Sequence, residues 1–223
     1  MTSDNTRTYK REKDPTRSAF IIIDMENGFI DPASPLCIAG AAATVPALAA
    51  AVEAAREKNI PIFYVKRIYR ADGSDVENTR YECWRSAENV LTPGSAGPCS
   101  IEEPAALAPR PEDYIIIKPR FSAFFQTELD LILRRLGVRN IILTGTTTPN
   151  CIRTTAYDGI SLDYNVIALE DCCSSQTPEI QRANIEDMIR IGVTVMSSAE
   201  FAASYGAGTV ADLSERIRGN IYL

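Results

Sequence analysis

The chain has 223 residues, of which 45% are hydrophobic and 23% charged, so it is long enough to bury the core of one globular domain. Its formal net charge of -6 argues against a nucleic-acid partner, because phosphate binding requires clustered Lys and Arg side chains. The sequence contains no histidine, which excludes Ser-His-Asp and Cys-His catalysis and zinc sites built on histidine.

The N-terminal region predicts neither export nor membrane insertion. The first 17 residues are polar and charged, and no later stretch is apolar enough to span a bilayer. We therefore expect a cytoplasmic protein with no membrane partner, in which a polar arm over residues 1–17 precedes a single domain over residues 18–223. The six cysteines are expected to be reduced, because a chain of this size does not need disulfides.

Six short apolar runs predict the strands of a buried parallel sheet. They are nearly continuous in apolar residues instead of alternating, which is typical of strands covered on both faces. The runs cover residues 19–24, 61–66, 114–118, 140–145, 165–170 and 193–197. Helical patterns lie between them over residues 45–58, 127–136, 151–162 and 178–191. This alternation predicts a three-layer α/β/α domain with right-handed crossovers.

Two long segments do not fit this alternation. Residues 29–44 and 67–112 are rich in Pro, Gly, Ser and Asp, and the second contains the single tryptophan, Trp84. Irregular segments of this length in a compact domain are usually functional or disordered. We interpret residues 67–112 as a lid or an oligomer contact, with a plain surface excursion as the alternative.

Polar residues at the ends of the predicted strands are the candidates for chemistry, because the ligand crevice of an open α/β sheet lies beyond the carboxyl ends of its strands. Asp24 and Lys118 each follow three isoleucines, and Cys151 follows the fourth predicted strand. An isolated buried charge costs several kcal/mol, so we expect Asp24 and Lys118 to pair. The alternative is that each residue only marks the point where its strand meets water.

Cys151 is the candidate nucleophile. Pro149 and Asn150 predict a helix start that places the sulfur at the positive helix end, where a thiolate is favoured. A nearby Lys118 would lower the pKa of the thiol further, while Asp24 could accept its proton and deliver it to a leaving amine. The alternative is an inert thiol, since free cysteines commonly pack as small hydrophobic residues.

Three segments resemble the isochorismatase-like cysteine hydrolases, and the resemblance covers roughly residues 18–198. The segments are residues 19–29, 117–124 and 144–151, the last followed by Thr155 and Asp158 on the next helix. The family uses an Asp, a Lys and a Cys in this chain order, which implies that Asp24, Lys118 and Cys151 are catalytic. The resemblance also implies strand order 3-2-1-4-5-6, a cis peptide between Thr146 and Thr147, and an oxyanion hole made by the backbone amides of Thr147 and Cys151.

Within the family, residues 146–151, 170–171 and 182–188 look most like the branch that cleaves ureides and carbamoylated amines, such as N-carbamoylsarcosine amidase, ureidoacrylate amidohydrolase and biuret hydrolase. The resemblance implies an amidohydrolase without cofactor or metal that cleaves a C–N bond of a small linear amide, ureide or N-carbamoyl compound through a thioester-type intermediate. It also implies a homo-oligomer, a dimer or tetramer. The alternatives are a nicotinamidase-like hydrolase of cyclic amides and a catalytically idle binding or assembly member of the fold.

Six further side chains are candidates for contacting the substrate. An arginine suits a substrate carboxylate, because its planar fork can bind both oxygens, although a structural ion pair is the alternative. Glu26 stands where the family often has Gln, and it could contact a substrate amide or pair with an arginine. The six candidates are Glu26, Arg67, Trp84, Arg120, Phe121 and Phe125.

Overall fold

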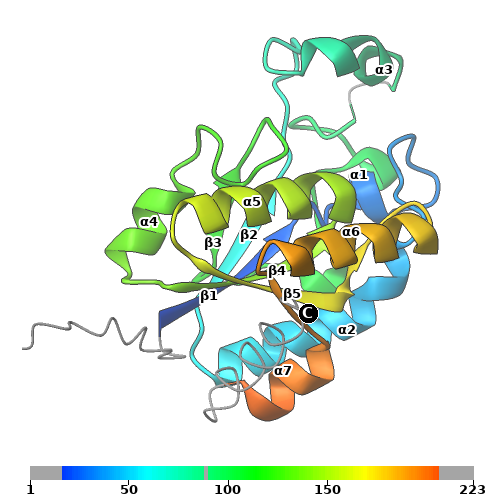
Figure 1. Ribbon diagram of the computed structural model, residues 1–223. Helices are drawn as coiled ribbons and strands as arrows, with labels where there is room; N and C mark the ends of the chain where they lie inside the picture. Colours follow the sequence, from blue (N-terminus) through cyan, green and yellow to red (C-terminus); the bar gives the residue numbers. More distant parts are fainter. Residues whose placement is uncertain (1–16, 88–89, 206–223) are drawn as a thin grey trace, which may run out of the picture.

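A computed structural model describes residues 17–87 and 90–205, so residues 1–16 of the predicted polar arm lie outside the described residues. The described chain forms one parallel sheet with the order β3-β2-β1-β4-β5-β6 (Figure 1). The strands are β1 (Ser18–Ile23), β2 (Ile62–Lys66), β3 (Tyr114–Ile117), β4 (Asn140–Thr146), β5 (Asn165–Ser174) and β6 (Thr194–Met196). The predicted fold class and strand order are confirmed.

Helices cover both faces of the sheet. α4 (Leu129–Arg135), α5 (Arg153–Ser161) and α6 (Pro178–Arg190) lie on one face, and α2 (Ala41–Glu57) and α7 (Ser198–Ser204) lie on the other (Figure 1). A π-helical turn, η5 (Thr148–Ile152), precedes α5. Short helices that the sequence did not predict are α1 (Asn27–Ile30), α3 (Tyr81–Ser86), α7, and the 3-10 turns η2 (Asn78–Arg80), η3 (Gly97–Cys99) and η4 (Ala105–Leu107).

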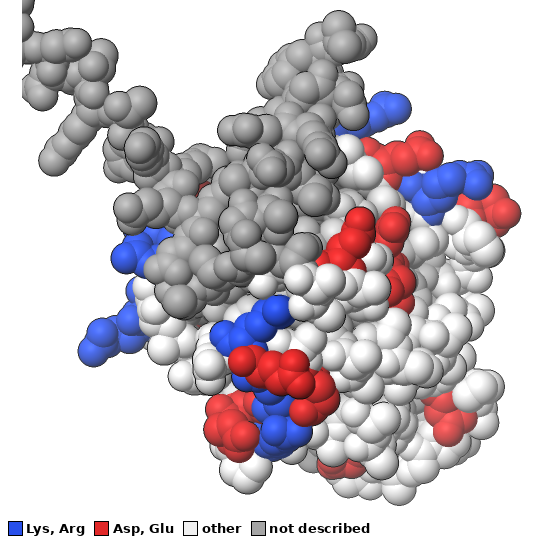
Figure 2. All heavy atoms as spheres, turned by 90° about the horizontal axis from the view of Figure 1, so that it is seen from below, with Lys and Arg blue, Asp and Glu red and all other residues white. Residues whose placement is uncertain are grey.

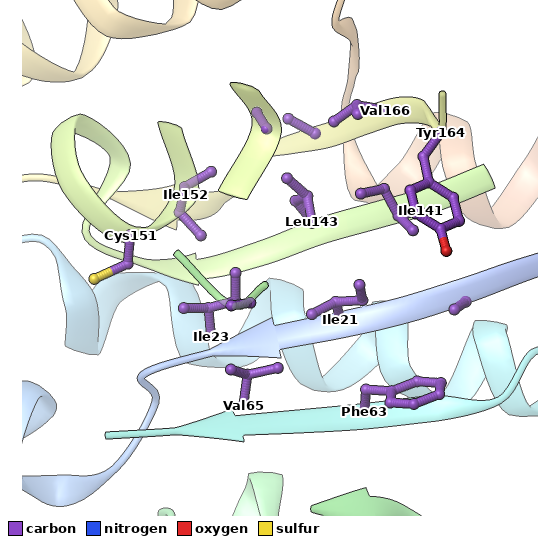
Figure 3. Close-up of a cluster of buried hydrophobic side chains, with 14 of the residues drawn as sticks. Ile21, Ile23, Phe63, Val65, Ile141, Leu143, Cys151, Ile152, Tyr164 and Val166 are labelled. Carbon is purple, nitrogen blue, oxygen red and sulfur yellow. The ribbon is translucent and has the colours of Figure 1, made fainter. Parts of the chain in front are cut away.

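The sheet separates two apolar clusters. Along β1, Ile21 and Ile23 join the cluster beneath α4, α5 and α6, whereas Phe20 and Ile22 join the cluster beneath α2 and α7. Both faces of the strand are therefore buried, which explains its continuous apolar sequence. Figure 3 shows the first cluster, with Cys151 at its edge and the sulfur directed away from the labelled apolar side chains.

The excursion over residues 67–112 has a small core of its own. Tyr69, Trp84 and Leu91 pack there against Phe29 of α1, and the indole Nε1 of Trp84 donates to the carbonyl of Val90 at 3.2 Å. α3 lies apart from the sheet at the far end of this excursion (Figure 1). Trp84 is 5% exposed and serves as a core residue of the excursion.

Three further observations concern the surface, the cysteines and the helices. On the face seen in Figure 2, acidic and basic side chains of the described residues lie intermixed and form no continuous basic stripe. All six cysteines are free thiols, as the sequence predicted. Within residues 17–87 and 90–205, no helix is both long and apolar enough to cross a bilayer.

Candidate active site

Four neighbouring strands each deliver one functional side chain to the same edge of the sheet. Lys118 follows β3, Arg67 follows β2, Asp24 follows β1, and Cys151 lies in η5 after β4. The strands are parallel, so their carboxyl ends share one edge. All four side chains are buried, with exposed fractions between 0% and 6%. Their charges must therefore be satisfied by protein groups, because little water reaches them.

The Lys118 ammonium joins the carboxylate to the sulfur. Its Nζ donates to Oδ2 of Asp24 at 2.7 Å, to the carbonyl oxygen of Arg120 at 3.2 Å and to Sγ of Cys151 at 3.6 Å. An ammonium has three donors, and each of them has an acceptor here. The structure thus brings together the three residues that the sequence predicted to be catalytic.

Asp24 keeps one carboxylate oxygen available for proton transfer. Its Oδ1 is buried and makes no hydrogen bond within the described residues, whereas Oδ2 is held by Lys118. The backbone φ of Asp24 is 51°, in the left-handed region that few residues other than glycine adopt and that Asp tolerates better than most. The amide of Asp24 is fixed by the carbonyl of Val65 at 3.0 Å. Because only Oδ2 is bound by Lys118, the lone pairs of Oδ1 are free to accept a proton.

The electrostatics of Cys151 differ from the sequence prediction. Burial raises the pKa of its thiol, and the Asp24 charge raises that pKa further, while Lys118 and Arg67 act in the opposite direction. The net shift is upward, so the thiol is protonated at neutral pH when the site is empty. The expectation of a resting thiolate was wrong because desolvation outweighs the two cations. Forming the nucleophile therefore requires a base.

The end of β4, just before the turn that carries Cys151, passes very close to β1. Gly145 has φ of 107°, and a Cβ added there would lie 2.0 Å from the carbonyl oxygen of Ile23. Only glycine fits this approach. The next peptide bond, between Thr146 and Thr147, is cis, as the family resemblance implied. Thr147 and Cys151 both line the cavity described below, and their role as an oxyanion hole stays a prediction.

Arg67 supplies a second cation beside the sulfur. Its Nη2 lies 3.6 Å from Sγ of Cys151, and its Nη1 donates to Oε1 of Glu77 and to the hydroxyl of Tyr69, both at 2.7 Å. The Tyr69 hydroxyl donates in turn to Oε2 of Glu77 at 2.9 Å. Although burial opposes it, the Arg67 charge lowers the pKa of Glu77. Two residues of the excursion thereby hold an arginine that reaches the nucleophile.

Glu26 holds the backbone of Arg67 in place. Its Oε1 accepts the backbone N–H of Arg67, while its Oε2 is buried and makes no hydrogen bond within the described residues. Burial, followed by the charges of Asp24 and Glu103, raises the pKa of Glu26 well above its ordinary value. The protonated, uncharged form of the side chain is therefore favoured, and in that form it resembles the glutamine that the family often has at this position.

A cavity of about 210 Å³ opens in front of Cys151 and Asp24. Of the predicted substrate-binding residues, Arg67 and Phe121 line it, whereas Glu26, Trp84, Arg120 and Phe125 do not. Arg120 instead donates to the carbonyl oxygens of Asp75 and Pro119. The remaining lining residues are Asp24, Phe29, Pro35, Leu36, Cys37, Ile38, Arg80, Thr146, Thr147, Asn150, Cys151 and Gln176.

Sequence reasoning missed one charged lining residue, Arg80. It lies in η2, within the segment that the sequence marked only as an excursion. Within residues 17–87 and 90–205, no three Cys, Asp or Glu side chains converge in a way that could hold a metal ion.

A carboxylate, an ammonium and a thiol that meet at the carboxyl edge of a doubly wound sheet and face a cavity form an enzyme-type site. The chain belongs to the isochorismatase domain family, whose profile matches residues 18–200. This confirms the family resemblance found in the sequence.

Two relatives and one solved structure illustrate the similarity. A probable inactive nicotinamidase of Arabidopsis thaliana is 37% identical over 188 residues, which cover 83% of this chain and 94% of the relative. The ureidoacrylate amidohydrolase RutB of Azorhizobium caulinodans is 30% identical over 207 residues, covering 84% and 90%. The crystal structure of an isochorismatase family protein from Desulfovibrio vulgaris is 39% identical, covers 83% of this chain and 96% of its own, and superposes with a TM-score of 0.78.

Proposed function

We propose that the protein is a cysteine-dependent amidohydrolase that cleaves a C–N bond in a small linear amide, ureide or N-carbamoyl compound. The observation that carries this proposal is the shared Lys118 ammonium, which contacts Oδ2 of Asp24 and Sγ of Cys151 while Oδ1 of Asp24 has no partner among the described residues. The similarity to a ureidoacrylate amidohydrolase supports a linear ureide as the substrate type.

The first step is activation of the nucleophile. The raised pKa of Cys151 means that the thiol must lose its proton to a neighbouring base, and the free Oδ1 of Asp24 is suited to take it. Lys118 and Arg67, both 3.6 Å from Sγ, stabilise the thiolate as it forms. The proton stays within the site, so the cluster does not change its total charge.

The second step is acyl transfer. The thiolate attacks the substrate carbonyl carbon, and the oxygen takes up the negative charge beside the backbone amides of Thr147 and Cys151. Asp24 then returns its proton to the substrate nitrogen, and the C–N bond breaks. Ammonia or an amine leaves, and the acyl or carbamoyl group remains on Sγ.

The third step regenerates the enzyme. Water enters the space that the amine has vacated, and Asp24 takes a proton from it while the oxygen attacks the thioester or thiocarbamate carbon. The C–S bond breaks, the acid leaves, and the sulfur recovers its proton from Asp24. Each group ends as it began, which is the requirement for turnover.

One relative is named a probable inactive nicotinamidase, which supports the alternative that a chain with this fold has no catalytic activity. The present chain keeps Asp24, Lys118 and Cys151 in mutual contact beside a cavity, which favours an active enzyme. A preference for nicotinamide over linear ureides would favour the cyclic-amide alternative instead.

The test is an ammonia-release screen over ureides, N-carbamoyl amino acids, simple amides and nicotinamide, run with the wild type and Cys151→Ala. We expect the variant to lose about 10⁴-fold or more in kcat, as removal of a nucleophile typically does. Cys83→Ala, which removes an exposed thiol, is the matched control and should leave the rate unchanged. Activity that persists in Cys151→Ala would overturn the nucleophile, and a wild type that cleaves none of the compounds would overturn the proposed function.

A further inference from the structure

The cavity wall contains an arginine that has no acidic partner in the described part of the chain. Arg80 lines the cavity, and its guanidinium carbon lies 5.0 Å from the centre of the Phe121 ring. Among residues 17–87 and 90–205, no carboxylate lies within ion-pairing distance of it, whereas Arg67 on the same wall is paired with Glu77 at 2.7 Å. The two arginines therefore differ in what they can offer a ligand.

The charge balance of the site isolates Arg80. Asp24 is neutralised by Lys118 at 2.7 Å and Arg67 is neutralised by Glu77 at 2.7 Å, while Glu26 lies outside the cavity lining. One positive charge is then left over at the cavity of a chain whose formal net charge is -6. A cavity that presents an unpaired guanidinium attracts an anionic ligand.

We propose that Arg80 binds a carboxylate of the substrate, which makes the natural substrate an N-carbamoyl compound or linear amide that carries an acid group. This inference rests on the proposed function and specifies its substrate. A guanidinium can bind both oxygens of a carboxylate with two parallel hydrogen bonds. The cation–π contact with the Phe121 ring holds the guanidinium at the cavity wall.

The arrangement of the wall also indicates how such a substrate lies. The guanidinium groups of Arg67 and Arg80 lie 5.3 Å and 5.0 Å from the centre of one ring, that of Phe121, and Arg67 reaches the nucleophile at 3.6 Å. Arg67 and Arg80 thus share one ring on the cavity wall, and Arg67 is the arginine of this pair that contacts the sulfur. Phe29 and Ile38 add apolar wall, which suits a short hydrocarbon spacer. The substrate has its reactive carbonyl at Cys151, a short spacer, and a carboxylate at Arg80.

The effect of Arg80 should fall on binding. The carboxylate does not change during the reaction, so its contact stabilises the bound substrate and the transition state equally and acts through KM. A hydrogen-bonded contact to a charged group corresponds to about 10- to 100-fold in affinity. Arg80 is an exposed residue, and solvent screening places the expected value toward the lower end of this range.

The experiment compares ammonia release from N-carbamoyl-β-alanine and from its methyl ester, in which a methyl group replaces the negative charge. We expect the wild type to prefer the acid, and Arg80→Gln to lower kcat/KM for the acid by about 10- to 100-fold, mainly through KM, so that the acid-to-ester ratio approaches one. Arg80→Lys should recover part of the preference, because it keeps the charge but loses the fork. Arg85→Gln is the matched control, since Arg85 is an exposed arginine of α3 paired with Glu82, and it should leave both rate constants unchanged.

The possible results separate the two proposals. A wild type that prefers the ester, or an Arg80→Gln variant that loses the same factor on both compounds, overturns the carboxylate contact and leaves the amidohydrolase proposal intact. If the wild type cleaves neither compound, calorimetric binding to Cys151→Ala decides. If Cys151→Ala binds the acid more tightly than the ester and the double variant Cys151→Ala/Arg80→Gln loses this preference, the carboxylate contact is supported although the proposed hydrolysis is not. If Cys151→Ala binds the acid and the ester equally, the contact is overturned.

Discussion

The sheet and the excursion over residues 67–112 contribute to the site in different ways. The sheet delivers Asp24, Lys118 and Cys151 from strand ends that are buried on both sides. The excursion has a small separate core around Trp84 and supplies Glu77 and Arg80, which hold or complete the cavity wall. The difference indicates that the sheet fixes the chemistry, whereas the excursion adjusts which molecule reaches it. Substitutions in the sheet should affect all substrates alike, and those in the excursion should depend on the substrate.

The largest effect is expected at the centre of the sheet-derived group. Lys118→Met leaves the buried Asp24 charge without its partner, which should lower the free energy of unfolding by about 3–5 kcal/mol and abolish turnover. Urea denaturation and ammonia release measure the two effects. Lys66→Met is the matched control, because Lys66 ends the neighbouring strand β2 and pairs with the buried Glu103 at 2.9 Å. The Lys66→Met variant should lose a comparable free energy of unfolding but retain turnover when folded. An equal loss of activity in both variants would contradict a catalytic role for Lys118.

A smaller effect is expected where the excursion touches the nucleophile. Glu77→Gln removes the charge that holds Arg67 beside Cys151, and we expect kcat/KM to fall about tenfold for charged and neutral substrates alike, the size of one charged hydrogen bond. The equal loss distinguishes this positioning residue from Arg80, whose substitution should discriminate between the two. Glu82→Gln, which breaks the exposed pair with Arg85, is the control. A Glu77→Gln variant that affects only the acid would show that the two arginines act as one subsite.

The last prediction concerns stability alone, through its dependence on pH. Because the folded-state pKa of Glu26 is raised above its unfolded value of about 4.5, the folded protein keeps a proton that the unfolded chain releases. Its contribution to stability is complete below pH 4.5 and is lost as the pH rises toward the folded-state pKa. The Glu26→Gln variant should not show this loss. Its free energy of unfolding should rise relative to that of the wild type by up to about 1.4 kcal/mol for each unit of increasing pH. Urea denaturation between pH 5 and 8 measures it, with the exposed Glu57→Gln as control. Parallel stability curves for wild type and Glu26→Gln would show that Glu26 is ionised.

The fold and the three central residues could be predicted because their signals are local. A run such as Phe20 to Ile23 must be buried on both faces, and a charge directly after it must find a partner or reach water. Burial therefore made the pairing of Asp24 with Lys118 one of two expectations, and the structure shows this pair. The bounds of α2 and α4 shifted by a few residues, since helix ends depend on packing that a pattern does not contain.

The remaining features depend on distances through space. The direction of the Cys151 pKa shift results from a balance between burial and three neighbouring charges, and no sequence pattern gives that balance. Arg80 could not be singled out from the sequence, because what distinguishes it is a place on the cavity wall without an acidic partner among the described residues. Trp84 was predicted to contact substrate, and it packs instead in the core of the excursion, outside the cavity lining.

The close passage of Gly145 over Ile23 has a consequence for how the enzyme can evolve. Ile23 immediately precedes the proposed base, and Gly145 lies near the end of β4, which leads to the proposed nucleophile. The close pairing of these two residues therefore sets the spacing between the two halves of the proposed catalytic group. A methyl group there would push the halves apart without touching any ligand. Selection for hydrolysis should therefore act on Gly145, which has no side chain, as strictly as on the reactive side chains themselves.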